Sequence, residues 1–364
     1  MSVTPFPAVL PKPELIASAE TFFGVVKEHY GEYRARGMFA PYPSPGLWVY
    51  RLRERGTSYV GVLGVLPAAR LGDGYLRRHE GTLAASEQAQ LQLLVLRQAA
   101  VKPVLLTYPA DVDLDAALMR VVERSRPEFA LADGPDVSHE LYFREPDSAE
   151  ARQLAEAFRR RIDAAYVADG HHRVRALELY NARRETEGLA PVPLFAAWFS
   201  DAFVRVRPFH RVVQLPAGLS ALALLARLAG LFEVEVLPAT APPPAVHHLT
   251  LLLDGEAFGL RWRAGVLPGH GIVLDAGLFN DLVAGPLFGI DDVRTDTRIT
   301  YVPGIGGVEA VAAAMAGRPD RAGFLLHGIE ARDMFAVVDA GMTMPPKSTW
   351  FEPRMRNGLV VAEV

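Results

Sequence analysis

Apolar residues recur along this chain with two spacings, and each spacing predicts one kind of secondary structure. Repeats of three or four residues predict helices, whereas alternating or continuous apolar runs predict strands. Before position 205, helices are predicted at 14–36, 114–123, 148–161 and after residues 82 and 170. Asp147 is the expected cap of the third of these helices. Strands are predicted at 47–52, 58–66, 104–108, 141–143, 165–168 and 194–199.

The rest of the chain repeats this mixture of helices and strands. Helices are predicted at 219–229 and 308–315, a hairpin at 248–263, and strands at 299–302 and 324–326. Because both types alternate throughout, the sequence predicts a mixed α/β (α+β) fold. At about 150 residues per domain, a chain of 364 residues is expected to form two domains. We predict an N-terminal domain over 1–205 and a C-terminal α/β domain over 206–364.

The composition fits a folded protein and excludes several functional classes. Half of the residues are hydrophobic, which excludes disorder as the main state. Lys and Arg number 38 and Asp and Glu 42, so the net charge of −4 argues against a dedicated nucleic-acid-binding domain. The chain has no cysteine, which excludes disulfides, thiolate metal centres and a cysteine nucleophile.

Neither the N-terminal residues nor the most apolar stretch of the sequence indicates a secretory or membrane segment. Residues 1–7 lack the basic and apolar regions of a signal peptide. The most apolar stretch, 219–237, is interrupted by Arg227, Glu233 and Glu235, so it does not form an uncharged span of about 20 residues. We therefore expect a cytoplasmic protein without membrane contact.

The sequence Asp169-Gly170-His171-His172-Arg173 lies where a predicted strand runs into a predicted helix. The first amide groups of a helix lack partners within the helix, and the helix dipole is positive there. Two histidines and an arginine on this positive end favour a bound anion, most naturally a phosphate. The glycine allows close approach of the backbone, and the arginine adds a forked donor.

Two other interpretations of this turn remain open. Asp169 could simply cap the helix, with the histidines solvated or bonded to neighbours. His171 and His172 could bind a metal together, but adjacent helical side chains point about 100° apart and do not readily share one ion. No metal ligands are therefore predicted.

Two further segments carry candidate chemistry. Glu80 follows His79 in a predicted loop, where an exposed carboxylate is usually structural. Lys347, Ser348 and Thr349 follow two prolines and combine a cation with two hydroxyl groups. Such a set can hold a phosphate, although a plain turn explains it almost as well.

Three motifs together resemble a known family of bacterial proteins, the domain of unknown function 1015. They are Ala168–Arg173, residues 79–82 (His-Glu-Gly-Thr) and residues 344–351 (Met-Pro-Pro-Lys-Ser-Thr-Trp-Phe). The first motif is also similar to that of ADP-dependent free-serine kinases of the ParB/sulfiredoxin superfamily. This resemblance implies a ParB/sulfiredoxin-like nucleotide-binding core with residues 109–163 as an insertion.

The resemblance also implies roles for individual residues. Glu80 would be the general base, and Asp169 a second catalytic residue. Nucleotide phosphates would be held by Gly170, His171, His172, Arg173, Lys347, Ser348 and Thr349. We expect these separate motifs to converge on one cleft, while the role of Phe209-His210-Arg211 stays unassigned.

The predicted function is a nucleotide-dependent phosphotransferase that uses ADP or ATP with Mg²⁺. Its acceptor would be a small hydroxyl compound, with serine or a related amino acid as a candidate. One alternative is a nucleotide-binding sensor without catalysis, and another is a phosphatase or nucleotidase that uses the same anion site with water. A homodimer is among the oligomeric states left open.

Overall fold

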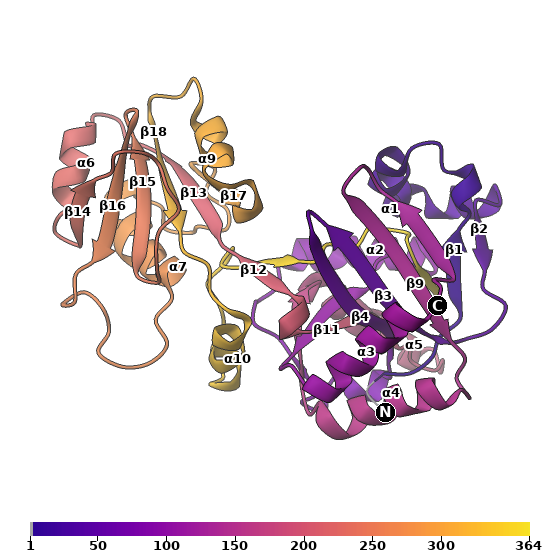
Figure 1. Ribbon diagram of the computed structural model, residues 1–364. Coiled ribbons are helices and arrows are strands. Elements are labelled where there is room, and N and C mark those ends of the chain that lie inside the picture. Colours follow the sequence, from indigo (N-terminus) through magenta and orange to yellow (C-terminus); the bar gives the residue numbers. More distant parts are fainter. Residues whose placement is uncertain (1–2) are drawn as a thin grey trace. The chain divides into compact units, whose positions relative to one another are not determined.

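The computed structural model describes residues 3–364, which form two compact units (Figure 1). The first unit contains the chain up to Val204 together with Pro353–Val364, and the second contains Arg205–Glu352. Residues 353–364 were predicted to belong to the second domain, but they lie in the first unit. These residues return to the first unit because β20 (Val361–Glu363) pairs with β1 (Ala8–Pro11) and β6 (Ala99–Ala100).

An eight-stranded mixed sheet forms the centre of the first unit, in the order β5-β10-β7-β11-β4-β3-β9-β8. Strand β11 is buried at every residue, and β4 at all but its first two, as expected for strands inside a sheet that is covered on both faces. The bounds are β3 Leu47–Glu54, β4 Thr57–Leu66, β5 Leu76–Arg77, β7 Val104–Tyr108, β8 Phe129–Ala132, β9 Val137–Arg144, β10 Ala165–Asp169 and β11 Leu194–Ser200.

The directions of three neighbouring strands determine what meets at one edge of this sheet. β10 is parallel to β5, so the residues that follow these two strands lie at the same end. β10 is antiparallel to β7, with Asp169 opposite Leu105, so the residues that precede β7 also lie at that end. Three segments distant in sequence therefore meet there.

The described part of the first unit also contains five α-helices: α1 Ala19–Ala35, α2 Ala84–Arg97, α3 Val112–Arg124, α4 Ala149–Arg161 and α5 His171–Thr186. The first predicted helix begins later than expected, because residues Pro13–Leu15 form only a 3₁₀ turn and the Ser18 side chain caps α1. The predicted cap of α4 was also wrong. Ser148 rather than Asp147 is the cap, and its hydroxyl accepts a hydrogen bond from the Ala151 amide at 3.1 Å.

Residues 109–163, expected as an insertion, are part of the core of the first unit. They contribute α3, α4, β8 and β9, and β9 pairs with β3 along its whole length. Leu118 on α3 and Phe158 on α4 are completely buried in the same hydrophobic cluster as Trp198 of β11.

A smaller sheet, β2-β1-β20-β6, includes β2 (Phe39–Pro41) and joins the two ends of the described chain.

The second unit is built on a six-stranded antiparallel sheet in the order β14-β16-β15-β18-β13-β17. A two-stranded ribbon pairs β12 with β19. The strands are β12 Arg205–Arg207, β13 Phe209–Gln214, β14 Phe232–Val236, β15 His248–Leu253, β16 Glu256–Trp262, β17 Ile299–Pro303, β18 Arg321–Leu326 and β19 Trp350–Glu352. The helices are α6 Ala221–Leu228, α7 Asp275–Leu278, α8 Gly285–Phe288, α9 Gly307–Met315 and α10 Ala331–Asp339, and a π-helical segment, Phe279–Ala284, connects α7 and α8.

Within residues 3–364, every helix is too short or too polar to cross a lipid bilayer.

The cap of α4 provides a test of this part of the fold. Ser148→Ala removes the hydroxyl that accepts from the Ala151 amide, so the free energy of unfolding should fall by about 0.5–2 kcal/mol. Asp147→Ala is the matched control and should change it by less than about 0.5 kcal/mol. Urea denaturation of both variants measures the difference, and equal losses would return the cap to Asp147.

Candidate functional site

The turn between β10 and α5 can be formed only by glycine without strain. Gly170 has φ +113°, a value that side chains with a Cβ rarely adopt. A Cβ at this position would lie 2.6 Å from Nη2 of Arg173, because the guanidinium packs against the glycine. Gly170 is also the N-cap of α5, and no side chain caps the helix. The alternative in which Asp169 caps the helix was therefore wrong.

Asp169 instead gathers three cations at the start of α5. Its carboxylate lies 2.8 Å from Nη2 of Arg173, 3.8 Å from Nζ of Lys102 and 3.7 Å from Nη1 of Arg354. Lys102 precedes β7, whereas Arg354 belongs to the segment that returns from the C-terminal end. Three positive charges against one negative charge leave an excess of two beside a helix N-terminus.

The electrostatics of this cluster favour an additional anion. Burial raises the pKa of Asp169, but Arg173, Lys102 and Arg354 more than offset it and keep the pKa well below its usual range. Burial and the neighbouring Arg173 lower the pKa of Lys102 to about 8. Nε of Arg173 is buried and has no hydrogen-bond partner among residues 3–364. Buried donors normally have partners, so this one indicates a missing acceptor.

Glu80 and His79 lie beside this turn, because they follow β5 at the edge where β10 ends. Ligand atoms of His79, Glu80 and His171 all lie within 4.8 Å of one another. The two imidazole rings are perpendicular, with centroids 4.4 Å apart at 83°. Burial lowers the pKa of His79 to about 4 and that of His171 well below its usual value, so both rings are neutral near pH 7.

Lys347, Ser348 and Thr349 belong to the second unit and are described within it. The ammonium group of Lys347 lies 5.3 Å from the centre of the Phe209 ring. The Ser348 hydroxyl donates to the Pro345 carbonyl at 2.6 Å, as in a local turn. Their convergence with Arg173 on one cleft stays a prediction.

The unassigned residues Phe209-His210-Arg211 form the beginning of β13 and have structural contacts. Arg211 is completely buried, donates to the Phe209 carbonyl, and its guanidinium lies 5.5 Å from the centre of the Tyr301 ring. His210 Nδ1 accepts a hydrogen bond from the Leu326 amide at 3.2 Å. These contacts connect β13 to its neighbours β17 and β18.

Lys102 and Arg354 were not predicted as site residues. Lys102 lies just before the predicted strand 104–108, and this place at the start of a strand could have indicated the edge of a sheet. No sequence pattern marks Arg354 as a site residue, because only the folding of the chain brings it close to Asp169. A joint metal site of His171 and His172 was one interpretation of the turn, but the structure pairs His171 with His79.

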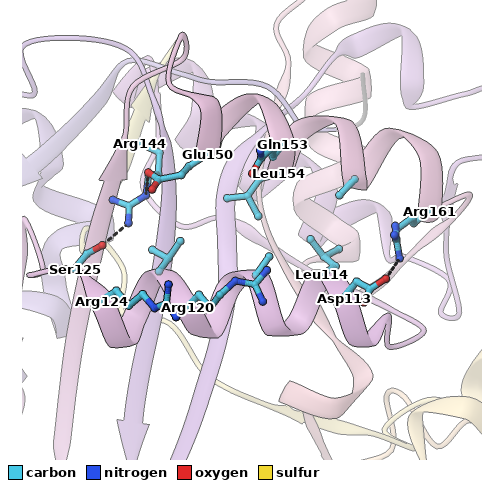
Figure 2. Close-up of a pocket in the computed structure, with 13 residues that line it drawn as sticks. Asp113, Leu114, Arg120, Arg124, Ser125, Arg144, Glu150, Gln153, Leu154 and Arg161 are labelled. Atoms are coloured by element: carbon cyan, nitrogen blue, oxygen red, sulfur yellow. Dashed lines mark hydrogen bonds and ion pairs between the residues drawn. The ribbon is translucent and has the colours of Figure 1, made fainter.

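A separate hollow of about 390 Å³ lies between α3 and α4 (Figure 2). Its polar lining includes Arg120, Arg124 and Arg144, and Arg161 binds Asp113 at one end at 2.8 Å. None of the predicted site residues is part of this lining. The turn at α5 and this hollow are distinct features of the first unit.

Comparison with known proteins agrees with the family that the motifs indicated. Residues 9–277 match the family described as protein of unknown function (DUF1015). The chain belongs to this family. No curated protein matches the sequence.

Solved structures resemble the chain over most of its length but at low identity. SbnI with a C-terminal truncation, from Staphylococcus aureus, is 11% identical with a TM-score of 0.44, and the match covers 81% of this chain and 85% of that one. A mutant free serine kinase in complex with ADP is 13% identical with a TM-score of 0.39, covering 82% and 92%. A conserved hypothetical protein from Pyrococcus furiosus is 14% identical with a TM-score of 0.39, covering 81% and 93%.

The role of Gly170, which precedes α5, can be tested against Gly188, which follows the end of the same helix. Gly170→Ala should lower the free energy of unfolding by about 1–3 kcal/mol and displace Arg173. It should also abolish the rise in melting temperature that inorganic phosphate produces in the parent. Gly188→Ala is the control, because Gly188 also has positive φ, at +71°, but an added Cβ there meets nothing within 4 Å.

Thermal melts with and without phosphate distinguish backbone strain from loss of the anion site. Gly188→Ala should lose stability yet keep the full phosphate shift. An unchanged phosphate shift in Gly170→Ala would mean that the anion does not bind at this turn.

Proposed function

We propose that this protein is a nucleotide-dependent phosphotransferase whose phosphate site is the N-terminus of α5. The observation that carries the proposal is the excess of two positive charges around Asp169, next to helix amides that no side chain caps. A nucleotide diphosphate or triphosphate supplies the negative charge that balances such a cluster. The buried and unpaired Nε of Arg173 is a donor for one of its oxygens.

Each residue of the turn has a part in this proposal. Gly170, His171, His172 and Arg173 surround the phosphates, and Asp169 orients Arg173 through the 2.8 Å ion pair. Since its carboxylate is engaged by three cations, Asp169 acts by positioning rather than by taking a proton. Lys102 and Arg354 add positive charge that lowers the energy of the transferring phosphoryl group.

Glu80 is the proposed general base that accepts the proton of the acceptor hydroxyl. It lies at the same sheet edge as the phosphate turn, close to His171. The attacking oxygen forms a bond to the terminal phosphorus of the nucleotide as the bond from that phosphorus to the bridging oxygen breaks, and the nucleotide shortened by one phosphate leaves. ADP or ATP with Mg²⁺ is the proposed donor, and serine or a related small hydroxyl compound is the proposed acceptor. Lys347, Ser348 and Thr349 are proposed as further phosphate contacts from the second unit.

Two substitutions separate catalysis from binding. Glu80→Gln should keep nucleotide affinity but reduce turnover by about 10²- to 10⁴-fold, because the amide cannot accept the proton. Arg173→Ala should weaken nucleotide binding by about 10- to 100-fold, because a charge-assisted contact is lost. Calorimetry with ADP and ATP, and phosphate transfer to serine and other hydroxyl acceptors, measure the two effects.

Matched controls come from the exposed last turn of α5. Glu185→Gln and Arg183→Ala remove the same groups far from the turn along the helix and should change neither quantity. Binding without transfer to any acceptor, unchanged by Glu80→Gln, would indicate a nucleotide sensor. Release of inorganic phosphate without transfer would indicate a phosphatase or nucleotidase.

The lowered pKa of Lys102 predicts a pH dependence of nucleotide affinity. Lys102 is charged below its pKa of about 8, so affinity for the anion should fall as pH rises from 7 to 9. Lys102→Met should bind more weakly at pH 7 and lose most of this slope. Calorimetry at pH 7, 8 and 9 measures the nucleotide affinity of both proteins. The same change of affinity with pH in the parent and in Lys102→Met would show that Lys102 is not part of the site.

A further inference from the structure

The three side chains His79, Glu80 and His171 form a cluster with the composition of a metal site. Two imidazoles and one carboxylate lie at the start of α5 with ligand atoms within 4.8 Å of one another. We propose that this cluster binds one divalent transition-metal ion of the zinc type. The proposal concerns metal binding by the protein alone and does not depend on the phosphotransferase function.

The geometry is close to that of a bound ion. Zinc binds histidine nitrogens and carboxylate oxygens at about 2.0–2.2 Å, which places ligand atoms roughly 3.2–3.6 Å apart in a tetrahedron. Small side-chain rotations bring atoms within 4.8 Å to that spacing. The perpendicular rings of His79 and His171 let both imidazoles direct a nitrogen to one point without stacking.

The surroundings of the two histidines also point to a ligand. A ring nitrogen of His79 hydrogen-bonds to the backbone carbonyl of Val167, an arrangement that fixes the tautomer and orients ligating histidines in metal sites. His171 is 6% exposed, and its Nε2 is buried without a hydrogen-bond partner in the described part of the chain. An ion bound by this cluster would give the buried ring nitrogen of His171 a partner.

The ligand set determines which class of metal is expected. Mg²⁺ prefers oxygen ligands and keeps much of its water, so two buried imidazoles suit it poorly. Imidazole suits zinc and neighbouring transition metals. Two histidines and one glutamate also form a common three-residue zinc set that leaves a position for water or a phosphate oxygen. A carboxylate that binds through one oxygen keeps a second, so Glu80 retains an acceptor atom.

Direct metal binding tests this proposal without nucleotide or acceptor. Chelator-treated protein is titrated with Zn²⁺ by calorimetry and with Co²⁺ by visible absorption. We expect one equivalent to bind and the cobalt bands of a histidine-ligated, four- or five-coordinate site to appear. His171→Gln and His79→Gln should each weaken zinc binding by at least about 100-fold, because each removes a direct ligand.

His172→Gln is the matched control, since it changes the adjacent histidine of the same helix turn but lies outside the cluster. It should bind zinc as the parent does. Glu80 is half-buried rather than buried, so Glu80→Gln provides a variant expected to fold even where a buried histidine variant does not. Zinc should raise the melting temperature of the parent and of His172→Gln, but not that of Glu80→Gln.

Two results would overturn the proposal. One is a parent protein that binds neither Zn²⁺ nor Co²⁺ at tens of micromolar. The other is equal zinc affinity in the parent and in folded Glu80→Gln, which would locate the metal elsewhere. Because neither assay contains nucleotide, failure here is distinguishable from failure of the phosphotransferase proposal.

Discussion

The ion pairs of Asp169 are the interaction on which the first unit's site depends. One carboxylate connects the start of α5, the residue before β7 and the segment that returns from the second unit. Leaving this carboxylate without its cations, or the cations without it, would place uncompensated charge in a largely buried position. The Asp169 side chain therefore links the edge of the sheet at β7, the start of α5 and the C-terminal segment of the chain.

The backbone at Gly170 makes this arrangement accessible to a ligand. Since no side chain caps α5, the amides at its start remain available, and the guanidinium of Arg173 packs over the glycine with one buried donor unpaired. The carboxylate neutralises only part of the positive charge around it. The Asp169 carboxylate thus positions the cations of the site, and their remaining positive charge is the physical basis for the proposed phosphate binding.

Much of this fold could be predicted from the pattern of apolar residues. Strand β7 was predicted at its observed bounds because it is a nearly continuous apolar run, and the predicted helix over 148–161 matched α4 to within one residue because its apolar residues have helical spacing. Short strands such as β5 and β20 were missed, since two or three residues carry no period. Because β20 was not predicted, Arg354 could not be placed near Asp169. Only the pairing of β20 with β1 and β6 returns this part of the chain to the first unit.

The turn itself was predicted because its chemistry is local: glycine, histidines and arginine are adjacent in sequence. The contributions of Lys102 and of the His79 ring were not, because they depend on which strands are neighbours and in which direction they run. Hydrophobic periodicity predicts where strands form along the chain, but it does not predict their order in the sheet. The metal-ligand cluster was missed for the same reason, since its histidines come from two strands' ends.

The central claim is that the positive cluster around Asp169 binds the phosphates of a nucleotide. The most direct measurement is a crystal structure of the protein with ADP and Mg²⁺. The account predicts a phosphate oxygen within hydrogen-bond distance of the His171 or His172 amide and of the Arg173 guanidinium. Nucleotide bound away from this turn, for example in the hollow between α3 and α4, with Arg173 still unpaired at Nε, would contradict it.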